Sequence, residues 1–217
     1  MAGLPGRKWL LALLVAGLGA APGAHAQGGA IGAAISGFNM VSGAATPVFR
    51  PGAYQQLGGD WVAARVCVRG GDVLLVRRPE EDNREKALGP ESVKRVVVGR
   101  DTMQVLTRFT YRVKKQDYYC SAGFVQRVVG QQGYSLYRRQ HFDRSGLTEP
   151  TTVFLLQRTP DGPLETVPEQ QKAFQAFMLP ILADNAALAE QLQRGQIFHS
   201  QTPYVLWKYL AGKQAAR

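Results

Sequence analysis

An alternation of apolar and polar residues with a period of two constrains this chain more than any other feature, and it recurs between residues 61 and 158. It is densest in Asp117–Arg158, where breaks at Gln131–Gly133 and Asp143–Pro150 separate three such runs. A period of two predicts β-strands, and short turns between them predict antiparallel pairing. A flat sheet of so many strands would leave a long open edge, so we expect it to curl into a roll, barrel or sandwich.

Turn-forming residues set the limits of the predicted strands. Gly70-Gly71-Asp72 predicts a hairpin, and Gly123, inside the longest run, predicts a bend or a bulge. The charged stretch Arg78–Pro90 is predicted to be a loop, and the Gly/Ala-rich lead-in at residues 27–57 a flexible segment. The predicted strands are Trp61–Val68, Val73–Arg77, Val93–Val98, Met103–Val113, Tyr118–Val129, Tyr134–Phe142 and Thr151–Arg158.

The period changes to that of an amphipathic helix near residue 166. Thr166 and Glu169 have the spacing of a capping box, and Pro180 predicts that this first helix ends near Leu179. A second helix is predicted from a cap at Asp184 to Gly195, and a third from Thr202-Pro203 to Gly212. Short amphipathic helices are not stable alone, so they are expected to pack on the sheet.

The first residues have the pattern of an export signal. Arg7 and Lys8 form a short basic segment, and the apolar run Trp9–Leu18 follows it. Ala24-His25-Ala26 supplies the small residues that signal peptidase recognises, which predicts cleavage before Gln27. The apolar run is shorter than the ~20 residues of a membrane-spanning helix, so a cleaved signal is favoured over an anchor.

These patterns together predict the class and the domain organisation. The class is α+β, with a curled antiparallel sheet followed by two or three short helices. Residues 1–26 are the predicted signal peptide, 27–57 the lead-in, 58–165 the β domain and 166–217 the helical segment packed on the sheet. The predicted location is periplasmic or secreted.

The two cysteines, Cys67 and Cys120, both lie in predicted strands. An exported protein enters an oxidising compartment, where such a pair favours a disulfide. Two buried free thiols, which pack as small hydrophobic side chains, are the alternative.

No arrangement of side chains predicts catalysis or metal binding. His141 and His199 have no ligand-like spacing to each other or to a cysteine. No Gly-x-Ser-x-Gly sequence is present, and the acidic residues gather in loops or at helix starts, where solvation and capping account for them. We therefore expect no catalytic residue, no metal and no cofactor.

Basic residues are the one feature that points to a ligand. The formal net charge is +10 at pH 7, and removal of Arg7 and Lys8 leaves an excess of eight. Such charge favours anionic partners, although solubility alone also accounts for it, and nucleic acid is not expected for an exported protein. The candidate residues are Arg112, Lys114, Lys115, Arg127, Arg138 and Arg139, interleaved with Tyr111, Tyr118, Tyr119, Tyr134 and Tyr137. Tyrosine also favours strands when no ligand is involved.

The run Phe124–Gly130, followed by Ser135–Arg138, resembles a pattern in uncharacterised exported proteins of Bacteroidetes-type bacteria. Those proteins have an early Gly-Asp-Thr hairpin turn, which Gly71-Asp72-Val73 matches with Val in place of Thr. Their terminal helices are similar to Phe177–Leu188 and Tyr204–Tyr209. The resemblance covers most of the mature chain and implies a signal peptide, a β-rich body and a helical tail. It implies no activity, cofactor or catalytic residue.

The sequence therefore favours a non-enzymatic envelope or secreted protein that acts as a binding or interaction module. One alternative is binding of a polyanion, either an acidic glycan or an anionic lipid, through a basic and aromatic face of the sheet. A second is a hydrolase whose site combines His141 with a distant carboxylate. A third is carriage of a lipid or small ligand inside the curled sheet, which requires an apolar cavity.

Overall fold

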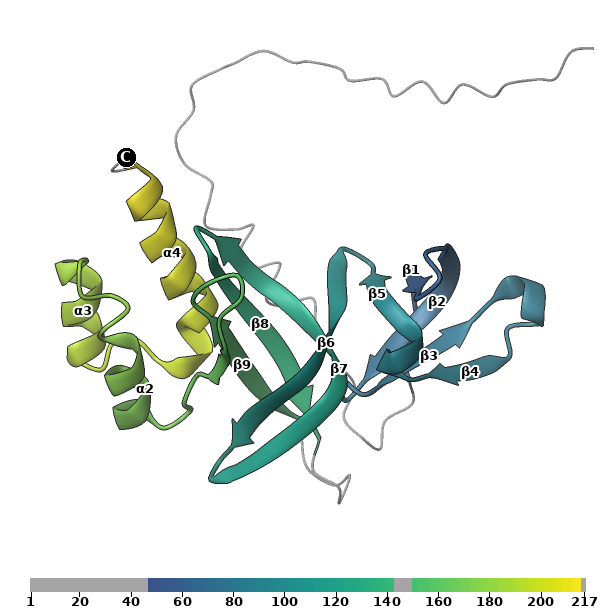
Figure 1. Ribbon diagram of the computed structural model, residues 1–217, viewed down its shortest axis with the longest axis horizontal. Helices are drawn as coiled ribbons and strands as arrows, with labels where there is room; N and C mark the ends of the chain where they lie inside the picture. The colour runs from purple at the N-terminus through teal and green to yellow at the C-terminus, as the bar shows by residue number, and fades with distance from the viewer. Residues whose placement is uncertain (1–46, 143–149, 216–217) are drawn as a thin grey trace, which may run out of the picture.

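A computed structural model describes residues 47–142 and 150–215 (Figure 1). The predicted signal peptide and most of the predicted lead-in lie outside the described residues. The strands are β1 (Arg50–Gln56), β2 (Trp61–Arg69), β3 (Val73–Arg77), β4 (Glu85–Leu88), β5 (Val93–Val98), β6 (Asp101–Val113), β7 (Gln116–Gln131), β8 (Tyr134–His141), β9 (Thr151–Gln157) and β10 (Leu164–Thr166). The helices are α2 (Gln171–Met178), α3 (Ala186–Gln193) and α4 (Thr202–Ala215).

All ten described strands form one antiparallel sheet in the order β10-β9-β8-β7-β6-β5-β1-β2-β3-β4. The sheet curls without closing, and the helices follow it in the chain (Figure 1). The predicted α+β class is confirmed.

Three strands, β1, β4 and β10, were missing from the sequence prediction. β1 lies in the predicted flexible lead-in, yet it pairs with β2 on one side and β5 on the other. Gly52 is required there because a Cβ atom would clash with the carbonyl oxygen of Val97. β4 lies in the predicted loop and pairs with β3. The side chains of these segments show no alternation, so only pairing with their neighbours makes them strands.

The long β6–β7 hairpin joins two lobes. β6 pairs with β5 only over Asp101–Gln104, whereas it pairs with β7 as far as Val113. β7 pairs with β8 only from Gln126 to Gln131. The N-terminal lobe is β1–β5 with the adjoining part of the hairpin, and the C-terminal lobe is the rest of the hairpin with β8–β10 and the helices (Figure 1).

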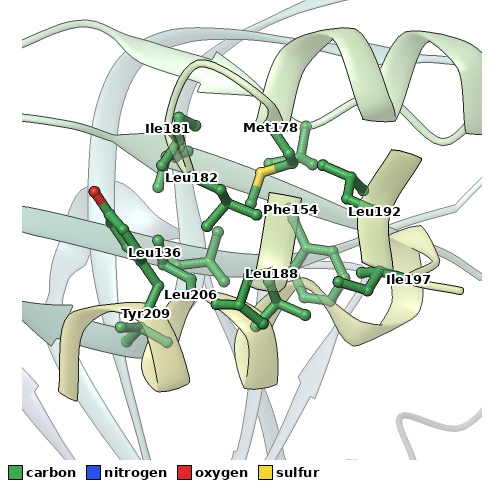
Figure 2. Close-up of a cluster of buried hydrophobic side chains, with 14 of the residues drawn as sticks. Leu136, Phe154, Met178, Ile181, Leu182, Leu188, Leu192, Ile197, Leu206 and Tyr209 are labelled. Carbon is green, nitrogen blue, oxygen red and sulfur yellow. The ribbon is translucent and has the colours of Figure 1, made fainter. Parts of the chain in front are cut away.

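In the C-terminal lobe, β8 and β9 are buried on both faces. Leu136 and Phe154 pack against the helices (Figure 2), and Leu156 belongs to the same buried cluster. Val153 and Leu155 point to the opposite face and pack inside the curl of the sheet with side chains of β6 and β7. Burial on both sides accounts for the continuous apolar run in β9.

α4 begins at Thr202, as predicted, whereas the first two helices begin at different residues from those predicted. Thr166 ends β10, and its Oγ1 accepts a hydrogen bond of 3.0 Å from the backbone N–H of Arg112, so it does not cap α2. α3 is capped by Asn185, whose Oδ1 accepts from the N–H of Leu188 at 3.1 Å. α4 continues past Gly212. Thr166 is engaged by a tertiary contact, and Asn185 makes the capping bond that was expected of its neighbour Asp184.

The turn between β2 and β3 lies between β7 and β8 where these two strands separate. The carbonyl oxygen of Gly71 accepts a hydrogen bond of 2.7 Å from the N–H of Phe124 in β7. It also accepts one of 3.0 Å from Nη1 of Arg139 in β8. The pairing of β7 with β8 ends at Gln126 and Arg138, so the hairpin turn replaces a strand partner beyond this point.

Arg139 holds this turn in place from inside the protein. Its side chain is 1% exposed, and Nη2 lies 2.5 Å from Oδ1 of Asp72. The guanidinium also lies over the ring of Tyr111, 5.0 Å from its centroid. Gly123 leaves room for it, because a Cβ atom there would clash with Nη1. The glycine expected to mark a bend therefore makes space for a buried charge.

The predicted disulfide is not formed in this structure, because both cysteines are free and buried. Alternation along β2 puts Cys67 on the face opposite Val66 and Val68, where it packs with Phe49. Cys120 packs in another cluster, inside the C-terminal lobe. The two thiols therefore lie in separate clusters, one in each lobe.

Burial raises the pKa of both thiols, so few thiolates are present at neutral pH. We expect no reaction of the native protein with a thiol reagent such as dithionitrobenzoate at pH 8. Two thiols per chain should react in denaturant without a reducing agent. Fewer than two would contradict the free state of the cysteines.

Substitution of Gly71 tests the docking of the turn. A Cβ atom on Gly71 would lie 2.8 Å from Nη1 of Arg139, and the residue has φ of +74°. Gly99 is a matched control, with φ of +61° and no atom within 4 Å of such a Cβ. Both Gly→Ala changes should cost roughly 1–2 kcal/mol for the left-handed backbone. Gly71→Ala should lose about 1–3 kcal/mol more in urea denaturation because of the clash. Equal losses would show that the packing of the turn is unimportant.

Candidate functional site

A cleft of about 790 Å³ lies between the β6–β7 turn and the segment that joins β10 to α2. The hydrogen bond from the Arg112 N–H to Thr166 ties the two walls together at one end. Among the described strands, none pairs with β6 on this side beyond Gln104, which leaves room for the cleft. It is lined by Thr110, Tyr111, Arg112, Lys114, Lys115, Asp117, Leu164, Thr166, Val167, Pro168, Glu169, Gln170 and Ala173.

The hairpin wall of the cleft carries an excess of positive charge. Arg112 forms two hydrogen bonds with Asp117, from Nε at 2.6 Å and from Nη2 at 2.8 Å. This bonding lowers the pKa of the Asp117 carboxyl and raises that of Arg112. Lys114 and Lys115 are exposed, and neither forms an ion pair within the described residues. The charges of Arg112 and Asp117 cancel each other, so the two lysines supply the net positive charge of this wall.

An exposed tyrosine continues the cleft along the outside of the hairpin. Tyr119 is 70% exposed, and it is the cross-strand partner of Thr110, which lines the cleft. Arg112 and Asp117 are cross-strand partners two positions further along the hairpin, on the same face as Thr110 and Tyr119. The ring of Tyr119, the hydroxyl of Thr110 and the guanidinium of Arg112 therefore lie on one face of the hairpin.

The structure separates the six basic residues that the sequence put forward as one face. Arg112, Lys114 and Lys115 gather at the cleft. Arg127 is exposed near the other end of β7. Arg138 and Arg139 are buried, so the predicted basic face does not include them.

Arg138 and Arg139 have internal partners instead. Nε of Arg138 donates to Oε1 of Gln126 at 3.1 Å, and Gln126 in turn donates to Asp101 at 2.9 Å. Burial lowers the pKa of Arg138. Arg139 pairs with Asp72, as described above. Adjacent residues in β8 point to opposite faces, and both faces of β8 are covered.

His141 lies beside the tyrosines of the hairpin. Its Nδ1 is 3.0 Å from the hydroxyl of Tyr111, and its ring centroid lies 4.4 Å from that of Tyr118. Within the described residues, no group of three or more His, Cys, Asp or Glu is placed to hold a metal ion.

His199 is packed rather than exposed. Its ring lies 5.1 Å from that of Phe154 and 6.2 Å from that of Phe174. Its Nε2 is buried without a hydrogen-bond partner among the described residues. Burial lowers the pKa of His199, so the neutral ring is the favoured form.

The second wall of the cleft could not be found from the sequence. Leu164, Val167 and Ala173 look like ordinary core or helix residues, and nothing in their spacing relates them to the hairpin. They meet it only because the curl of the sheet brings β10 back to β6.

No family model, no curated protein and no solved structure matches this chain. In the part of the chain that the structure describes, no helix has both the length and the apolar character needed to cross a membrane.

The buried His199 predicts acid sensitivity. Its pKa is lower in the folded than in the unfolded state, so its contribution to stability is complete above the unfolded value near 6.5. That contribution decreases as the pH falls below this value, because the unfolded chain binds the proton more readily. We expect the wild type to lose more stability than His199→Gln between pH 7.5 and pH 5, measured by urea denaturation. Equal losses would contradict the role of His199.

Proposed function

We propose that this is an exported, non-enzymatic binding protein that holds an acidic glycan against the β6–β7 hairpin and the adjoining cleft. Export rests on the basic, apolar and small-residue pattern of residues 1–26. The observation that carries the ligand class is the pair Lys114 and Lys115, which are exposed at the cleft without an ion-pair partner among the described residues. Two such ammonium groups attract carboxylates or sulfates from solution.

The hairpin also offers the apolar contacts that a sugar chain needs. The exposed ring of Tyr119 can pack against the C–H face of a sugar, while its hydroxyl stays in water. Leu164, Pro168 and Ala173 form an apolar part of the cleft wall, and Thr110 adds a hydroxyl. Mixed apolar and polar lining of this kind is typical of small-ligand sites.

A glycan fits this surface better than a lipid. An acyl chain requires an enclosed apolar cavity, whereas this cleft is lined by Arg112, Asp117, Glu169 and both lysines as well as by apolar side chains. A glycan can extend along the exposed hairpin and keep its hydroxyls solvated. Anionic lipid is the competing ligand in the test below.

Paired lysine variants test the proposal. Lys114→Gln/Lys115→Gln removes the two charges at the cleft. The matched control is Lys86→Gln/Lys94→Gln, which removes two exposed charges from β4 and β5 in the other lobe. Each exposed contact contributes roughly 0.2–1 kcal/mol, so the first variant should bind polygalacturonate about fivefold more weakly, and the control should change less than twofold. Added salt should weaken wild-type binding because it screens exposed charges.

The same measurement decides between glycan and lipid. Calorimetric titration of the wild type should show binding to polygalacturonate and none to phosphatidylglycerol vesicles. Tyr119→Ala should weaken glycan binding without a change in net charge. Preference for the vesicles, or equal effects of the two double variants, would overturn the proposal.

A further inference from the structure

A second cavity, of about 400 Å³, lies at the other end of β7. Its walls come from the end of β7, the β7–β8 turn, the start of β8 and the end of β9. The cleft described above adjoins the first residues of β7, so the two sites are at opposite ends of this long strand.

Arg127 gives this cavity its charge. The side chain is exposed, and it forms no hydrogen bond or ion pair with any described residue. The guanidinium lies against the backbone of Gly130, where any side chain would clash with it. None of the described residues that line the cavity is acidic. The guanidinium is therefore positioned by the backbone and keeps its donors available.

The remaining walls carry hydroxyl and amide groups. Oη of Tyr137 donates to Oε1 of Gln157 at 3.4 Å, and Nε2 of Gln157 donates to the carbonyl oxygen of Gly162 at 3.0 Å. These bonds fix both side chains in the cavity wall. Ser135 is buried beside them. Oε1 of Gln131 is buried and accepts no hydrogen bond from the described residues, so it is an acceptor that lacks a donor.

We propose that this cavity binds a single sugar residue that carries an anionic group. The forked donors of Arg127 suit a carboxylate or a phosphate, which accept two parallel hydrogen bonds. Gln131 requires a donor, which a sugar hydroxyl supplies, and Ser135 and Tyr137 can bond further hydroxyls. The volume is within the range of small-ligand sites. An acid without hydroxyls would leave the amide and hydroxyl groups of the wall without partners.

The test compares three probes that share one ring. Glucuronate and glucose 6-phosphate carry the two kinds of anion, and glucose carries neither. Titration calorimetry or chemical-shift titration of the full chain should show that at least one of the anionic sugars binds tenfold or more tightly than glucose. Which of the two binds more tightly identifies the anion as carboxylate or phosphate. An equal affinity for all three probes would overturn the proposal.

Two variants assign the preference to Arg127. Arg127→Gln should reduce the advantage of the anionic sugar over glucose to within about twofold, while the affinity for glucose itself stays the same. Gly130→Ala should weaken anionic-sugar binding without a change in charge, because the new methyl displaces the guanidinium. If Arg127→Gln fails to fold, Gly130→Ala alone decides the question.

Arg95→Gln is the matched control, since it removes one exposed arginine from β5, which lines neither site. It should leave the preference for the anionic sugar unchanged. A preference that survives Arg127→Gln and Gly130→Ala, or that is lost in Arg95→Gln, would overturn the assignment to this cavity. Polygalacturonate binding by the lysine variants is a separate measurement, so each of the two proposed sites can be contradicted without affecting the other.

Discussion

The ion pair between the buried Arg139 and the exposed Asp72 is the interaction on which the arrangement of the two lobes depends. Arg139 is held in β8, and Asp72 belongs to the β2–β3 turn of the other lobe. A buried guanidinium needs partners, because removal of a charge from water is costly. Asp72, the Gly71 carbonyl and the ring of Tyr111 supply them. Undocking of the turn would leave this charge inside the protein without its ion-pair partner. The ion pair therefore stabilises the docked arrangement of the two lobes.

The same interaction explains the shape of the sheet. The turn lies where β7 separates from β8, and its carbonyl takes the N–H of Phe124 that a continuous strand pair would have used. β7 is thereby free to pair with β6 alone through its first half, so the long hairpin can extend towards β10. The cleft at the hairpin and the cavity at the far end of β7 are both consequences of where strands part or end. The position of the hairpin wall of the cleft therefore depends on the docking of the turn.

Between residues 114 and 139, some basic side chains bond to groups inside the protein and others are exposed without such partners. Arg138 and Arg139 satisfy internal groups, whereas Lys114, Lys115 and Arg127 keep their donors for solvent or for a ligand. Both sets are basic, and Arg127 lies in a strand as Arg138 and Arg139 do, while Lys114 and Lys115 form the β6–β7 turn. The difference is whether a second layer covers the face on which the side chain lies: helices and the curl of the sheet cover β8, and nothing described covers the outside of the hairpin. Positive charge in a strand is therefore a weak indicator of a binding surface until burial is known.

The sequence by itself determined the class of fold, most of the strands and the presence of two or three short helices at the end, because alternation, turn residues and helical periodicity act over a few neighbouring residues. It also identified Lys114, Lys115 and Arg127 as candidate ligand contacts. Only the tertiary structure decided that β1 is a strand, that Cys67 and Cys120 lie in separate clusters, and that Arg138 and Arg139 are internal. The reason is physical: a period of two defines two faces of a strand but not what covers each face, and that depends on partners far away in the chain.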